Sequence, residues 1–155
     1  MGVMSRIEFG MGKAELQPAP IPDSWILEGK PFARNLLLSR SEDGAASTLL
    51  WDCTAGRFHW HYSIDETVYI LEGSVIVRDE NGDTRRLTVG DTAFFPCGTS
   101  ALWTVESYVR KLAFCRVPLP AALLKARRLA KRILVLLGLR RQSTGTGMPA
   151  MFGGS

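Results

Sequence analysis

The sequence predicts an all-β domain, an antiparallel sandwich or small barrel, followed by one helix. Short apolar or alternating runs recur between residues 25 and 117, and turn-forming residues separate them. These runs show no helical period. A long segment without glycine or proline appears only after the last of them, at residues 121–137. Together these observations set the fold class and the order of its parts.

The chain begins with an extended arm, residues 1–23. The three prolines in residues 17–22 exclude a helix and favour a polyproline-like conformation. The amino terminus lacks the apolar stretch of a signal peptide, and Arg6 stands where a myristoylation motif requires Ser or Thr. Three cysteines without a C-x-x-C spacing fit free thiols in a reducing compartment. We therefore expect a cytoplasmic protein.

The expected β domain covers residues 24–118 and contains about ten strands. Asn81-Gly82 lies between two strand-like runs and favours a type I′ hairpin, since both residues accept positive φ values. Glycines at residues 73, 90 and 98 mark further tight turns. The predicted strands are residues 25–27, 35–39, 47–52, 57–62, 67–71, 74–79, 84–89, 92–95, 101–105 and 108–117.

A basic helix is expected within residues 119–139, with Pro120 at its first turn and Gly138 at its end. On a helical wheel, leucines and alanines gather on one arc and five basic residues on the other. The charge is asymmetric: residues 1–106 carry 9 basic and 15 acidic side chains, whereas residues 107–155 carry 10 basic and no acidic ones. The remaining residues, 140–155, are glycine-rich and expected to be disordered.

Three interpretations of this helix are considered, and two remain open. Its leucine face packs on the β domain or on a partner subunit, as most amphipathic helices do, which allows a homodimer. Alternatively, residues 121–137 lie on an anionic membrane surface as a peripheral contact. The third partner, nucleic acid, is not expected, because no recognised binding module accompanies the charge. Five charges inside the segment exclude a transmembrane span.

The candidate site is the aromatic stretch of residues 57–66. His59 and His61 are the only histidines, and two residues apart on a strand they share one face. Glu66 follows five residues later, so its carboxylate offers a third donor; Asp65 replaces it if the turn is one residue tighter. The spacing alone also fits two half-buried strand residues without a ligand.

Two motifs then identify a resemblance. The stretch is similar to the first cupin motif, with His59, His61, Glu66 and Gly73 in its H-x-H, Glu and Gly positions. The second cupin motif is matched at Gly90, Pro96 and Gly98. The wider pattern resembles the single-cupin group named after (S)-ureidoglycine aminohydrolase. The resemblance implies a conical antiparallel β-barrel, a double-stranded β-helix, whose pocket holds a metal when its ligands are present.

The departures from the pattern bear on function. Ala101 stands where the second motif supplies a histidine ligand, and Val105 and Cys53 replace two further motif residues. A metal would therefore depend on His59, His61 and Glu66, with Mn, Fe, Ni or Zn as candidates.

Other residues of the expected pocket are Ala101, Trp103 and Tyr69. Ala101 and Trp103 share strand parity, so they form either a pocket wall or part of the core. Two functions stay open. One is a cupin whose pocket takes a divalent metal and a small polar or carboxylate-bearing molecule, either as a metal-dependent enzyme or as a binding protein. The other is a metal-free cupin that serves as a small-molecule binding or accessory module.

Overall fold

The computed structural model describes residues 7, 9 and 14–136, and in α1 it describes side chains up to residue 134. The chain divides into two compact units, Met1–Pro118 and Leu119–Ser155. Within the described residues, the strands lie in the first unit and the helix in the second. The predicted tail, residues 140–155, lies outside the described residues, as do residues 1–6, 8 and 10–13 of the predicted amino-terminal arm.

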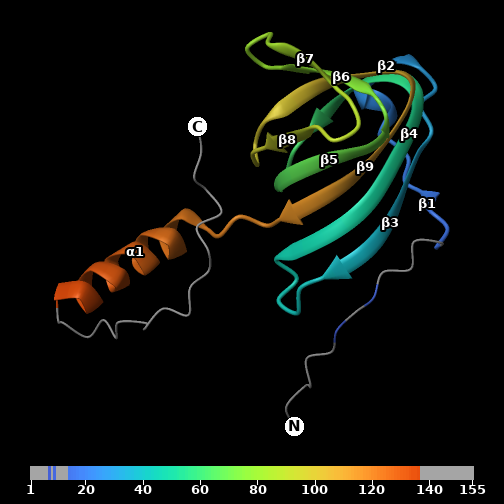
Figure 1. The fold of residues 1–155 in the computed structure, drawn as a ribbon. Helices are drawn as coiled ribbons and strands as arrows, with labels where there is room; N and C mark the ends of the chain where they lie inside the picture. The colour runs from blue at the N-terminus through green and yellow to red at the C-terminus, as the bar shows by residue number, and fades with distance from the viewer. Residues whose placement is uncertain (1–6, 8, 10–13, 137–155) are drawn as a thin grey trace. The chain divides into compact units, whose positions relative to one another are not determined.

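The first unit is an antiparallel sheet of nine strands, counted over the described residues. Its path runs β1-β3-β4-β9-β5-β8, with β2 paired to β4 and the β6–β7 hairpin attached to β9. The sheet curls over a core but does not close, and Figure 1 shows the curl. The strands are β1 (Gln17–Pro18), β2 (Ile26–Gly29), β3 (Ala33–Arg40), β4 (Ala46–His61), β5 (Asp65–Gly73), β6 (Val75–Asp79), β7 (Thr84–Leu87), β8 (Thr92–Phe95) and β9 (Ser100–Arg116); a 3₁₀ turn (Asp23–Trp25) precedes β2.

Two long strands, β4 and β9, organise the sheet, and both bend strongly in Figure 1. They pair along nearly their whole length, and the register shifts once, between Thr54 and Gly56. Before this bulge Trp51 pairs with Lys111, and after it Phe58 pairs with Trp103. A bulge inserts one extra residue, so side chains after it point to the opposite face from the one that strict alternation would give. Odd-numbered residues of β4 therefore face the core before the bulge, and even-numbered ones after it.

Aromatic rings fill the concave side of the sheet. Trp103 is 1% exposed; it stacks on Phe58 with ring centroids 6.4 Å apart and donates its indole N–H to the Tyr62 hydroxyl at 3.0 Å. Tyr62 in turn stacks on Phe95 at 4.5 Å. Such packing removes large apolar surfaces from water and holds the two halves of β4 and β9 together.

The predicted fold class is confirmed: the protein is mainly β and antiparallel, with one carboxy-terminal helix. The predicted segments 47–52 and 57–62 are one continuous strand, β4. The predicted segments 101–105 and 108–117 likewise fall on one strand, β9, which ends at Arg116. The hairpin at Asn81-Gly82 is present, with Gly82 at a φ of 90°. Its loop is longer than a two-residue type I′ turn, because the last pair of β6 and β7 is Arg78 with Thr84.

The second unit contains helix α1, Ala121–Leu136. It begins directly after Pro120, in agreement with the preference of proline for the first turn of a helix. All of its side chains from residue 121 to residue 134 are exposed. No helix in the described part of the chain is long and apolar enough to cross a membrane.

Candidate functional site

A buried ion pair lies in the interior of the curled sheet. Glu66 on β5 is 7% exposed and Lys111 on β9 is 3% exposed. The Lys111 ammonium donates to Glu66 Oε1 at 2.5 Å. Among the buried residues of the described chain, only Asp52 is charged besides these two. Charged groups are rarely buried unless they are paired, so each of these two side chains depends on the other.

Three tryptophans surround the ammonium of Lys111. Its Nζ lies 4.7 Å from the ring centroid of Trp103, 4.9 Å from that of Trp51 and 6.0 Å from that of Trp60. The negative face of each ring attracts a cation, and the attraction strengthens where water is excluded. The interior therefore holds one built-in positive charge, neutralised by one carboxylate and ringed by aromatic faces.

His59 and His61 lie on the opposite face of β4. Both are exposed, whereas their neighbours Phe58 and Tyr62 are buried in the core. The two imidazoles share a face, as expected for residues two apart, with ring centroids 6.3 Å apart. They line an open groove with Ala101, Ser100 and residues 78–80, and the Ser100 hydroxyl hydrogen-bonds to His61 Nδ1 at 2.7 Å.

The structure therefore does not bring the three expected ligands together. His59 and His61 lie in the open groove on the outer face of β4, whereas Glu66 is paired with Lys111 in the interior. No group of three histidine, cysteine, aspartate or glutamate side chains is placed to hold a metal among the described residues. The donor set present does not fit the metal that the cupin resemblance implies. Ala101 and Trp103 are both part of the buried core, while Tyr69 is 40% exposed.

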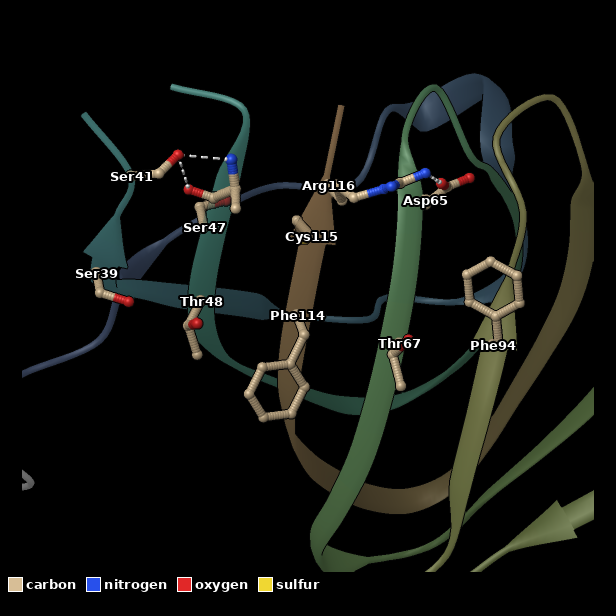
Figure 2. Close-up of a pocket in the computed structure, with 11 residues that line it drawn as sticks. Ser39, Ser41, Ser47, Thr48, Asp65, Thr67, Phe94, Phe114, Cys115 and Arg116 are labelled. Carbon is tan, nitrogen blue, oxygen red and sulfur yellow. Dashed lines mark hydrogen bonds and ion pairs between the residues drawn. The ribbon is translucent and has the colours of Figure 1, made fainter. Parts of the chain in front are cut away.

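A second groove, about 460 Å³ in volume, crosses the outer face of the sheet. Figure 2 shows Phe114, Thr67 and Phe94 side by side on three neighbouring strands. Thr67 lies between the buried Glu66 and Val68, so this face is opposite the ion pair. Apart from Ala46 and Cys115, the side chains that line the groove are hydroxylic, aromatic or charged. The lining residues are Ser39, Ser41, Ala46, Ser47, Thr48, Asp65, Thr67, Phe94, Phe114, Cys115 and Arg116.

Asp65 and Arg116 form the charged end of this second groove, which is called the sheet groove below. Arg116 donates to Asp65 Oδ2 at 3.1 Å, and the backbone N–H of Cys97 donates to Oδ1 at 3.0 Å. These donors hold the pKa of the Asp65 carboxyl below its usual range, the Cys97 amide having the largest effect. The Arg116 side chain is 65% exposed, so its remaining N–H groups face solvent. Asp65, predicted as an alternative metal ligand, is thus held in an ion pair.

The thiols offer little chemistry in the interior. Burial, reinforced by Asp52, raises the pKa of Cys53 to about 12. Burial, reinforced by Glu66, raises the pKa of Cys115 to about 11. Because the thiolate is the reactive form, neither is a nucleophile near neutral pH. Cys97 is exposed, and its Sγ lies 3.1 Å from the carbonyl of Ser63.

The prediction from sequence missed Lys111 and Arg116 as site residues. Lys111 has the same strand parity as Val109, Ala113 and Cys115, all of which are buried. A lysine at a buried position of an apolar strand indicates an internal carboxylate partner, and this signal was present in the sequence. Arg116 gave no such signal, because exposed arginines at strand ends are common.

Comparison with known proteins agrees with this fold. Residues 40–113 match the model of the EutQ-like cupin domain. A protein of unknown function of the DUF861 family from Pseudomonas syringae pv. tomato is 28% identical with a TM-score of 0.61; the match covers 66% of this chain but only 45% of that protein. KdgF from Halomonas sp. is 14% identical, with a TM-score of 0.54 and coverage of 76% and 99%. No curated protein matches.

An ethanolamine utilization protein, EutQ of Salmonella typhimurium, is 21% identical with a TM-score of 0.50, over 69% of this chain and 98% of that one. The open antiparallel sheet and its structural neighbours define the class of cupin-like folds. The match over residues 40–113 is more specific: this stretch, just under half of the chain, is similar to the EutQ-like cupin domain. The narrower kinship with (S)-ureidoglycine aminohydrolase is not confirmed by these matches and stays a prediction.

Proposed function

We propose that this cupin domain works without a resident metal, as a binding module for a small carboxylate-bearing molecule. The observation that carries the proposal is the pairing of Glu66 with Lys111 at 2.5 Å. Glu66 is the carboxylate that the first cupin motif offers to a metal, and here a lysine ammonium already neutralises it. The protein's own cation occupies the place next to this carboxylate.

A divalent ion beside Glu66 would be repelled by Lys111. Two unit charges 4 Å apart interact by about 4 kcal/mol at an effective dielectric constant of 20, and a doubly charged ion doubles this repulsion. His59 and His61, on the other face of β4, do not offset it. The repulsion by Lys111 and the placement of the two histidines therefore both favour the metal-free function over the metal-dependent one.

Metal analysis tests this proposal. We expect protein purified without a metal-affinity tag to contain far less than one metal ion per chain, with the same content in a His59→Ala/His61→Ala variant. Chelation with EDTA is expected to leave the midpoint of thermal unfolding unchanged, since no metal supports the fold. One equivalent of metal in the native protein that is lost in the double variant would instead restore the metal-dependent function.

The sheet groove is the proposed binding site. Arg116 offers a guanidinium to a ligand carboxylate, and Asp65 beside it accepts a hydrogen bond from a ligand hydroxyl or amino group. Phe114 and Phe94 are 46% and 60% exposed and provide apolar contact next to these charges. Such a mixture of aromatic surface and a few polar groups is typical of small-molecule sites.

Binding is tested with succinate and gluconate against succinamide and glucose, which lack the carboxylate. We expect the carboxylates to bind more tightly, by calorimetry or by chemical-shift changes. Arg116→Gln is expected to weaken carboxylate binding by at least about tenfold, because a charge-assisted hydrogen bond is lost. Arg86→Gln is the matched control, since Arg86 also forms an exposed pair, with Glu106. Equal binding by both variants, or no preference for carboxylates, would contradict the proposed site.

A further inference from the structure

Helix α1 exposes large apolar side chains over its described length. Leu123 is 56% exposed, Leu129 59%, Ile133 45% and Leu134 48%. On a helical wheel of about 100° per residue these four fall within one arc of the helix. Single exposed leucines are ordinary, but four on one face of a short helix form a contiguous apolar stripe and indicate a surface that binds something.

The opposite arc of the helix is strongly basic, although it also carries Leu124, which is 37% exposed. Five basic side chains lie between residues 121 and 136, there is no acidic one, and all five fall on the arc opposite the apolar stripe. They are Lys125, Arg127, Arg128, Lys131 and Arg132. A basic amphipathic helix is typical of segments that bind a membrane surface or an acidic partner. A single sign without compensation points to a partner that is itself extended and negative.

We propose that helix α1 binds the surface of an anionic membrane, lying parallel to it. The apolar stripe enters the boundary between headgroups and acyl chains. The basic side chains nearest its two edges, Arg127 and Lys125, extend to lipid phosphates and carboxylates, and the other three add to the positive field of the helix. The helix is about 24 Å long at 1.5 Å per residue. At this length it lies along the interface rather than across the bilayer. This proposal is independent of the ligand site on the sheet.

The experiment is flotation of the full-length protein with phosphatidylcholine vesicles, with and without phosphatidylserine. We expect binding only to the vesicles that contain phosphatidylserine, and weaker binding as salt rises. Each basic residue near such a surface contributes about fivefold to the affinity. The triple variant Lys125→Gln/Arg128→Gln/Arg132→Gln is therefore expected to bind roughly 100-fold more weakly.

A matched control removes the same charge from the first unit: Arg40→Gln/Arg78→Gln/Arg85→Gln, all three exposed in the sheet domain. It is expected to retain most of the binding. Leu129→Gln/Ile133→Gln tests the apolar stripe and is expected to abolish flotation while leaving the particle size in solution unchanged. The proposal is overturned if the protein does not float, if both triple variants lose binding equally, or if the apolar variant instead dissociates an oligomer.

Discussion

Replacing Lys111 by methionine is expected to lower the free energy of unfolding by about 3–5 kcal/mol. The substitution leaves the carboxylate of Glu66, 7% exposed, in the interior without its counter-ion. It also removes the cation from the faces of Trp51 and Trp103. Domains of this size are stabilised by only about 5–15 kcal/mol in total, so the loss is a large fraction. Denaturant unfolding followed by tryptophan fluorescence measures it.

The second partner distinguishes a buried ion pair from simple loss of packing. Adding Glu66→Leu to Lys111→Met removes the unpaired charge, so the double variant is expected to recover most of the lost stability. Arg86→Met, which breaks the exposed pair with Glu106, is the control and is expected to have a much smaller effect. If Lys111→Met changes stability no more than Arg86→Met, or if the double variant is less stable than Lys111→Met, the interior ion pair does not have the role assigned to it.

The fold followed from local features of the sequence. Alternating runs between glycine-containing turns predicted the strands, and the proline at residue 120 predicted the start of the helix. These features act over a few residues and do not depend on distant contacts. The prediction was wrong in separating residues 47–52 from 57–62 and residues 101–105 from 108–117. Each pair lies on one strand, because β4 and β9 continue through their bulge instead of turning.

Which side chains of β4 face the interior could not be predicted from local features of the sequence. Alternation places His59 and His61 on one face, and they do share one. Which face is inward depends on the competition between the histidines and the larger apolar surfaces of Phe58 and Trp60. The aromatic side chains take the interior, and the register shift after Thr54 allows it without moving Trp51 out of the core. A bulge of this kind is decided by pairing with β9, which lies some forty residues later in the chain.

The structure explains why glycine occupies position 73 of the first cupin motif. It ends β5 with a φ of 69°, a left-handed conformation that favours glycine. A Cβ added there would lie 2.0 Å from the carbonyl oxygen of Tyr108 on β9. That oxygen belongs to backbone held in the sheet, where it accepts a hydrogen bond from Ser74, so it has little freedom to move away. Glycine is required at this position of the protein because two strands approach too closely for any side chain.

Gly73→Ala is therefore expected to lower the free energy of unfolding by about 4 kcal/mol or to prevent folding, because backbone strain and a backbone clash combine. Gly90→Ala is the matched control: its φ of 92° is also left-handed, but nothing lies within 4 Å of an added Cβ. Only the conformational strain of about 1–2 kcal/mol is expected there. Soluble yield and denaturant unfolding of the two variants separate strain from contact. Equal destabilisation at both positions would show that the approach of β5 to β9 is not what requires glycine.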